Sequence, residues 1–186
     1  SGINMYFLFA IFLLGSFLLA YLIIYVPKFD YIQGRIFSFF NRETGSHNFQ
    51  SDKAIDSITS GGFFGKGIGE GTLKNRVPEA HTDYIISVIS EEFGIISIML
   101  ILFLFLTLIY MVFKKIRFEN DDMIKLILIG SISLILMQAT IHIGVNIRLL
   151  PTTGMTLPFL SYGGSSIIST SILAGIIVNR TKRNVN

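Results

Sequence analysis

The sequence contains no cysteine, which excludes disulfide bonds and thiol chemistry within these 186 residues. Charge is scarce as well, because only 15% of the residues are Asp, Glu, Lys or Arg. In contrast, 51% are hydrophobic and the mean hydropathy is +0.64. A soluble core of this size does not use so much apolar surface. The composition therefore indicates an integral membrane protein.

Long runs without charge predict where the chain crosses the membrane. Residues 3–27 and 93–113 carry none, and 126–147 contains only three strongly polar side chains. Each run is long enough to cross about 30 Å of hydrocarbon. A fourth stretch, 162–178, is shorter and rich in glycine and serine, which suits a helix packed inside a bundle. We predict an all-α membrane domain over 1–186, with four spans at about 3–26, 84–113, 124–147 and 162–179.

The distribution of basic residues predicts the orientation of these spans. Four basic residues lie in and around the link after the second span, and three follow the fourth: Lys114, Lys115, Arg117, Lys125, Arg180, Lys182 and Arg183. The positive-inside rule places this link and the tail at 180–186 in the cytoplasm. The long loop at 27–83 and the loop at 148–161 are then extracytoplasmic. The excess base lies where lipid headgroups are, so the pI of about 9.2 does not indicate a nucleic-acid partner.

The start of the sequence resembles neither a signal peptide nor a typical protein N-terminus. It has no basic leading region, no obvious cleavage site and an apolar run too long for a signal peptide. The first residue is Ser rather than Met. We therefore expect a piece of a longer protein.

The long loop closes on a segment, 76–83, that combines a proline with acidic residues. Pro78, Glu79 and Asp83 together are typical of a helix N-terminus, so the sequence predicts a helix running straight from here into the membrane. Asp83 would lie at the mouth of that helix, where a carboxylate stays ionised beside the bilayer. Such a position suits chemistry on a lipid-linked molecule.

A glycine-rich run at 61–71 precedes this segment. Its spacing does not match the dinucleotide-binding fingerprint. Either its backbone amides approach an anion, with Lys66, Lys74 and Arg76 as counter-charges, or it is a flexible outer loop. Either one of Glu91 and Glu92, near the outer interface, pairs with a base of this loop, or both lie at headgroup level.

The third predicted span carries Gln138, His142 and Asn146 at intervals of four residues. This spacing places them on one face of a helix, which should point into the bundle or a cavity because polar groups facing lipid are unfavourable. They either pack helices together through hydrogen bonds or line a pathway. His142 has no second ligand at metal spacing, so a metal site is not predicted there.

The loop before the last span is rich in turn-forming residues and ends in Gly163, Gly164, Ser165 and Ser166. Either serine can cap the final helix. The free N–H groups and dipole of such a helix start favour an oxyanion or phosphate.

Several of these segments, in order, resemble the signatures of the SEDS (shape, elongation, division and sporulation) family, to which FtsW and RodA belong. They are 60–67, 78–84, 91–94, Asn146, 150–152 and 157–166. The resemblance covers essentially the whole chain but only the last four helices of the family's ten-helix fold. The segments at 78–83 and 150–159 favour the FtsW branch over RodA, and Arg148 stands where a smaller residue is expected.

The resemblance implies a peptidoglycan glycosyltransferase of the bacterial cytoplasmic membrane, which polymerises lipid II during division or elongation. It implies a class B penicillin-binding protein as partner, beside other membrane proteins of the division or elongation machinery. The residue that the family requires for polymerisation maps onto Asp83.

For that reaction Asp83 would act as the base, orient the attacking hydroxyl, or hold a divalent cation such as Mg²⁺ or Mn²⁺. Substrate and pyrophosphate contacts are expected from basic or polar residues of the two outer loops, namely Lys66, Lys74, Arg76, Glu79, Gly163, Gly164, Ser165 and Ser166. Two alternatives remain: a carrier that moves the lipid-linked precursor across the bilayer, or a non-catalytic scaffold for a partner synthase.

Overall fold

The computed structural model describes residues 4–40, 46–77 and 79–182, and within these ranges it contains helices and no strand. The predicted all-helical class is confirmed. Three helices are long and apolar enough to cross a membrane, namely α1 (Met5–Tyr25), α5 (Ile85–Phe118) and α6 (Asp122–Asn146). The chain is therefore a multi-pass membrane protein.

The described residues form two compact units, 1–48 and 49–186. The first unit contains α1, the short 3₁₀ helix η1 (Pro27–Phe29) and α2 (Asp30–Phe40). Asn4 caps α1, because its side chain accepts a hydrogen bond from the amide of Tyr6 at 3.1 Å. No residue of α1 is buried within the unit, as expected for a helix that is apolar all round and meets lipid.

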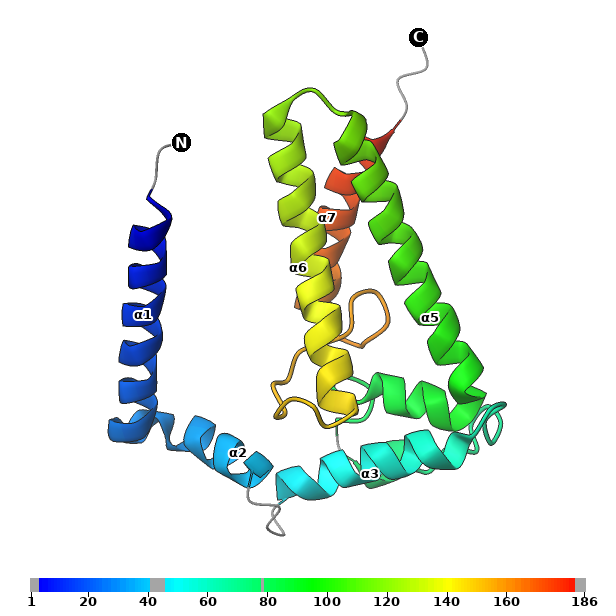
Figure 1. Ribbon diagram of the computed structural model, residues 1–186. Helices are drawn as coiled ribbons and strands as arrows, with labels where there is room; N and C mark the ends of the chain where they lie inside the picture. The colour runs from blue at the N-terminus through cyan, green and yellow to red at the C-terminus, as the bar shows by residue number, and fades with distance from the viewer. Residues whose placement is uncertain (1–3, 41–45, 78, 183–186) are drawn as a thin grey trace. The chain divides into compact units, whose positions relative to one another are not determined.

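The second unit contains most of α3 (Ser46–Gly61) and the helices that follow it. These are α4 (Leu73–Arg76), α5, α6 and α7 (Gly164–Thr181). In Figure 1, α5, α6 and α7 lie together, and the loop between α6 and α7 turns back among them. Asp121 starts α6 by accepting a hydrogen bond from the amide of Met123 at 2.8 Å. The fourth predicted span corresponds to α7, an 18-residue helix that is not among the three membrane-length apolar helices.

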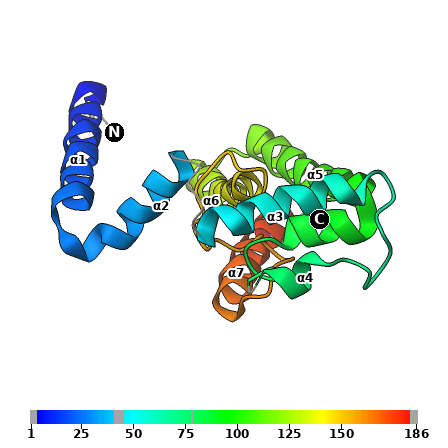
Figure 2. The same cartoon turned by 90° about the horizontal axis from the view of Figure 1, so that it is seen from below.

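α5 is interrupted at Gly94, whose backbone angles, φ 77° and ψ −178°, are not helical. The part before the glycine runs across the direction of the part after it (Figure 1), and it lies beside α3 when the molecule is turned (Figure 2). A positive φ of this kind suits glycine, which has no Cβ atom. The expectation of one straight helix from the turn at Asp83 into the membrane is therefore wrong. Residues 85–93 form a separate short segment.

Three apolar clusters pack the helices of this unit together. The first lies between α3, α4, residues 80–88 and the end of α6, and comprises Ala54, Leu73, Val77, Ala80, Tyr84, Val88 and Val145. The second joins the far half of α5 to α6 and α7, and comprises Val112, Leu128, Ile132, Ile135 and Ile177. The third comprises Ile86, Ala139 and Leu157. Between membrane helices such clusters stabilise by close packing rather than by removal of apolar surface from water. The first cluster thus holds Ala80 and Tyr84, which flank the turn that carries Asp83.

Candidate active site

Asp83 lies in a turn rather than in a helix. α5 begins at Ile85 with Tyr84 as its N-cap, and the expected helix start at Pro78 falls outside the described residues. The carbonyl of Glu79 accepts the amides of Thr82 at 3.2 Å and Asp83 at 3.0 Å. These bonds close the turn one residue before the N-cap of α5.

Three side chains hold the peptide groups of Thr82 and Asp83 in place. The hydroxyl of Ser161 donates to the Thr82 carbonyl at 2.8 Å, and Nε2 of His142 lies 3.3 Å from the same oxygen. Nδ2 of Asn146 donates to the Asp83 carbonyl at 2.9 Å. His142 and Asn146 are fully buried. Neutral donors thus fix the backbone at Asp83, while its carboxylate stays half-buried.

Asn146 uses both ends of its amide. Its Nδ2 also donates to the carbonyl of His142 at 2.9 Å, and its Oδ1 accepts from the hydroxyl of Ser87 at 2.8 Å and from the Ser87 amide at 3.2 Å. A buried amide satisfied in this way fixes α6 against the start of α5 at a defined register.

Gln138, on the same helix, bonds to the first turn of α7 and to the loop before it. Its Nε2 donates to the hydroxyl of Ser166 at 3.0 Å and to the carbonyl and hydroxyl of Thr156 at 3.0 and 3.1 Å. The Thr156 hydroxyl in turn donates to Ser166 at 2.7 Å. The structure therefore places all three residues of the predicted polar stripe against protein, and the Ser166 hydroxyl is engaged in helix packing.

A hollow opens beside the Asp83 turn. It measures about 430 Å³ and is lined by His81, Ile85, Leu160 and Tyr162. The amide of Tyr162 donates to the His81 carbonyl at 3.2 Å, so the loop before α7 forms one wall. A Cβ atom placed on Gly154 of the same loop would lie 3.8 Å from Oδ2 of Asp83, so this carboxylate oxygen also faces that loop.

α7 begins close to this wall, at Gly164, with Gly163 as its N-cap. Gly164 and Ser165 are exposed, and Gly163 and Ser166 are half-buried. The amide of Ile167 bonds back to the Gly163 carbonyl at 2.9 Å, which leaves the earlier amides of the first turn as donors for another group.

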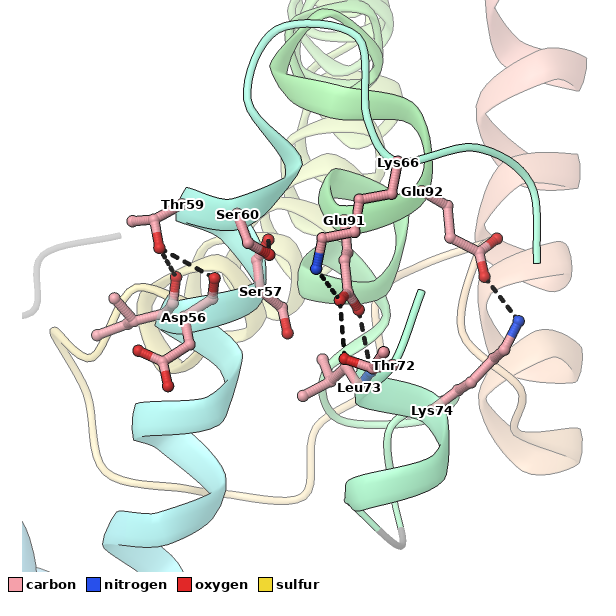
Figure 3. A network of polar contacts seen from close by, with 11 residues as sticks. Asp56, Ser57, Thr59, Ser60, Lys66, Thr72, Leu73, Lys74, Glu91 and Glu92 are labelled. Carbon is pink, nitrogen blue, oxygen red and sulfur yellow. Dashed lines mark hydrogen bonds and ion pairs between the residues drawn. The ribbon is translucent and has the colours of Figure 1, made fainter. Parts of the chain in front are cut away.

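The charged residues of the glycine-rich loop do not line the hollow. Lys66 Nζ lies 2.7 Å from Oε1 of Glu91, and Lys74 Nζ lies 2.9 Å from Oε1 of Glu92 (Figure 3). Of the two alternatives for these glutamates, the structure shows pairing with a base, and it does so for both rather than for one. Glu79 is exposed on the turn before Asp83.

Glu91 is the most enclosed carboxylate of this group, with a side chain 1% exposed. Besides Lys66 it accepts the hydroxyl of Thr72 at 3.1 Å and the amide of Leu73 at 2.9 Å, so it ties the start of α4 to α5. Its charge is matched and its oxygens are occupied, which gives it a structural role.

The glycine-rich loop clasps the interruption in α5. The amides of Lys66 and Gly67 donate to the carbonyls of Glu91 at 2.8 Å and Glu92 at 3.1 Å, and the amide of Ile95 donates to the Gly62 carbonyl at 2.9 Å. A side chain at Gly94 would overlap the carbonyl of Phe63. The loop is therefore neither a flexible connection nor an open anion cradle. It satisfies backbone groups that the break in the helix leaves without helical partners.

The sequence left open whether Asp83 binds a divalent cation. In the part of the chain that the structure describes, no group of three His, Asp or Glu side chains is placed to hold a metal ion. One carboxylate does not form a cation site by itself, and such an ion would need substrate phosphate oxygens as further ligands.

The chain is similar in sequence to known proteins. The family described as "Cell cycle protein", FTSW_RODA_SPOVE, matches residues 1–185. The chain belongs to the FtsW/RodA/SpoVE family. The resemblance to SEDS proteins is thereby confirmed.

Similar family members include proteins named probable peptidoglycan glycosyltransferase FtsW. The one from Caulobacter vibrioides is 38% identical over 148 residues, covering 80% of this chain and 38% of that protein. The one from Enterococcus hirae is 39% identical over 160 residues, covering 84% of this chain and 40% of that protein. These relatives confirm the predicted likeness to FtsW.

A solved structure shares the fold. It is described as "Structural coordination of polymerization and crosslinking by a peptidoglycan synthase complex", with a TM-score of 0.67 and 25% identity. The match covers 94% of this chain and 50% of the solved chain. The chain thus spans less than half the length of the FtsW relatives given above and about half of the solved chain.

Proposed function

We propose that the chain is part of a peptidoglycan glycosyltransferase that polymerises lipid II at the outer face of the cytoplasmic membrane, with Asp83 at its catalytic centre. The observation that carries this proposal is the fixation of the Asp83 peptide by Asn146, with Ser161 and His142 on the neighbouring carbonyl, beside an open hollow. Rigid support of a half-exposed carboxylate is what a positioned base requires.

In the proposed step, a sugar hydroxyl attacks the anomeric carbon of a second, lipid-linked sugar. The new bond joins the hydroxyl oxygen to that carbon, the bond from the carbon to the lipid pyrophosphate breaks, and the hydroxyl proton passes to a carboxylate oxygen of Asp83. The pyrophosphate leaves with the electron pair. Asp83 thereby acts as base and also orients the attacking hydroxyl.

The departing pyrophosphate needs stabilisation of its growing charge. We assign this to the first-turn amides of α7 at Gly164, Ser165 and Ser166, with Gly163 allowing close approach. We assign contact with the sugar that carries the hydroxyl to Glu79, which is exposed on the turn before Asp83. Lys66 and Lys74 are matched by Glu91 and Glu92, and we assign them to support of the helix break.

We further propose four membrane crossings, with α7 as the last. Basic residues near the end of α5 and in the tail after α7 support a cytoplasmic position for both, so that the loops at 27–83 and 148–161 are extracytoplasmic. Labelling of single cysteines at 68 and 182 from either side of the membrane tests this: label should reach position 68 from outside and position 182 only from inside.

The complex named in the solved relative's description supports a class B penicillin-binding protein as partner. A carrier function receives no such support. The stripe that would line a pathway is occupied, because Gln138, His142 and Asn146 all bond to protein groups.

The substitution Asp83→Asn, made at the chromosomal locus, tests the function. Asparagine keeps the shape and the backbone carbonyl that Asn146 holds, but it cannot take the proton. Polymer formation from lipid II in isolated membranes should fall about 100-fold or more, with the protein present at its normal level. Glu70→Gln removes an exposed acidic charge of the glycine-rich loop, away from the hollow, as a matched control and should reduce polymer yield far less. Wild-type yield in Asp83→Asn would overturn the catalytic assignment.

A further inference from the structure

A polar pocket of about 140 Å³ lies apart from the Asp83 hollow, between α3, α4, the glycine-rich loop and α5. Its lining is Lys53, Asp56, Ser57, Ser60, Lys66, Thr72, Leu73, Arg76 and Glu91. None of these residues lines the hollow beside His81. The two are therefore distinct surfaces of the same unit.

The charges of the pocket leave one cation unmatched. Lys53 pairs with Asp56 at 3.1 Å and Lys66 with Glu91 at 2.7 Å. Arg76 makes no ion pair with any carboxylate of the described residues, and it is exposed. A guanidinium in this position favours an anion with oxygens set for a two-pronged contact.

Ser57 gives a second, independent sign of a ligand. The residue is only 6% exposed, yet its hydroxyl forms no hydrogen bond with any other residue that the structure describes. In Figure 3 the side chain leaves α3 toward Thr72 and Leu73, on the side of the pocket. Most of the residue is buried but its oxygen atom is not fully enclosed, so the hydroxyl can bond to a group that enters the pocket.

Two exposed apolar side chains belong to the same loop as Lys66, which lines the pocket. Phe63 and Phe64 are 74% and 84% exposed. They lie at the interruption of α5, because the Phe63 carbonyl contacts Gly94 and the Gly62 carbonyl accepts the Ile95 amide. The charge-free run of α5 starts at this point, so the two phenyl rings lie at the boundary between headgroups and hydrocarbon.

We propose that this pocket binds the phosphate of an anionic phospholipid of the surrounding membrane. Arg76 and the hydroxyl of Ser57 contact the phosphate oxygens, while Phe63 and Phe64 lie against the acyl chains. Basic side chains beside apolar ones at the membrane boundary recognise such a headgroup. The bound lipid would bridge α3 and α4 beside the break in α5. This site goes beyond the proposed function and does not depend on Asp83.

Native mass spectrometry of the complete polypeptide as the cell makes it, in a neutral detergent, tests the proposal. The probes are short-chain phosphatidylglycerol, phosphatidylcholine, inorganic phosphate and a polyprenyl pyrophosphate. We expect phosphatidylglycerol to be retained over phosphatidylcholine, and Arg76→Gln to weaken its retention about fivefold, which is about 1 kcal/mol for one cation near a lipid phosphate. Ser57→Ala removes no bond within the protein and should weaken retention less. Arg180→Gln, an exposed basic residue on α7, is the charge-matched control and should change nothing.

Equal retention of both phospholipids, or equal weakening by Arg180→Gln and Arg76→Gln, would overturn the site. Inorganic phosphate that competes as well as the lipid would show a free-anion site instead. A polyprenyl pyrophosphate that displaces phosphatidylglycerol at lower concentration would assign the pocket to the substrate, which also contradicts the proposal. None of these outcomes bears on Asp83→Asn.

Discussion

Asp83 and Glu91 lie at the two ends of one short segment before the break in α5, but they are held in place by different contacts. Neutral side chains hold the backbone at Asp83, and its carboxylate remains half-buried beside a hollow. Glu91 is itself the anchor: its carboxylate is 1% exposed and bonds to Lys66, Thr72 and the Leu73 amide. The turn that carries the proposed catalytic carboxylate is held through its peptide groups, whereas Glu91 holds α4 against α5 through its own carboxylate oxygens.

Removal of the Glu91 carboxylate should lower the stability of the protein. Glu91→Ala leaves the buried amide of Leu73 without a partner and Lys66 without its counter-charge. We expect a loss of about 3 kcal/mol in the free energy of unfolding, because Lys66 is partly exposed and recovers some hydration. Denaturation of the purified protein in detergent measures this. Glu92→Ala, whose partner Lys74 also bonds to the Gly69 carbonyl, should lose less. An equal loss in both would show that Glu91 is not the anchor.

Substitutions at two glycines of the glycine-rich loop test whether this loop packs closely against the break in α5. Gly65 and Gly62 both have a positive φ, but a side chain at Gly65 would overlap the Glu92 carbonyl, whereas a side chain at Gly62 meets open space. Gly65→Ala should therefore destabilise by about 3 kcal/mol and Gly62→Ala by about 1–2 kcal/mol, the cost of left-handed backbone alone. Thermal denaturation of both variants gives the difference. Equal destabilisation would mean that the loop does not press on α5.

A substitution in α6 tests whether the support of the Asp83 peptide matters for polymerisation. Asn146→Ala removes the donor to the Asp83 carbonyl and leaves the Ser87 groups without their acceptor, so we expect about 2 kcal/mol of destabilisation. Displacement of Asp83 should lower polymer yield about 100-fold, beyond the loss of folded protein. Gln138→Ala, on the same helix but away from Asp83, is the control and should affect yield much less. Similar polymer yields in Asn146→Ala and Gln138→Ala would show that Asn146 has no specific role in polymerisation.

The smallest effect is expected at an exposed ion pair. Arg148, with a positive φ at the end of α6, pairs with Asp52 of α3, and both side chains are partly exposed. Asp52→Asn should lower stability by less than about 1 kcal/mol, since exposed pairs contribute little. Chemical denaturation at low and high salt checks this, and a loss above about 2 kcal/mol would show that α3 depends on Arg148.

The sequence was sufficient to predict helices near 5–25, 85–118, 122–146 and 164–181, because charge-free runs and their polar flanks are local properties. The spacing of Gln138, His142 and Asn146 likewise predicted that they share one face. It could not name their partners, since Asn146 reaches Ser87 and Asp83 across 59 and 63 residues of sequence.

The break at Gly94 was missed for a related reason. A single glycine in an apolar helix is compatible with a continuous helix, and the need for it becomes visible only through Phe63, whose carbonyl occupies the place of a side chain. The signal that was present is the succession of a glycine-rich loop and a later Glu91-Glu92-Phe93-Gly94, whose charges match Lys66 and Lys74. The sequence left open whether the loop approaches an anion or is a flexible connection, because its lysines had no assigned partner.

The most direct test of the central claim compares Asp83→Asn with Glu91→Gln in the complete protein, measuring polymer yield per folded molecule and melting temperature in parallel. We predict that Asp83→Asn melts like the wild type and forms almost no polymer, whereas Glu91→Gln melts at a lower temperature and the molecules that remain folded still polymerise. Polymerisation by Asp83→Asn at the wild-type rate, together with loss of polymerisation in well-folded Glu91→Gln, would contradict the account.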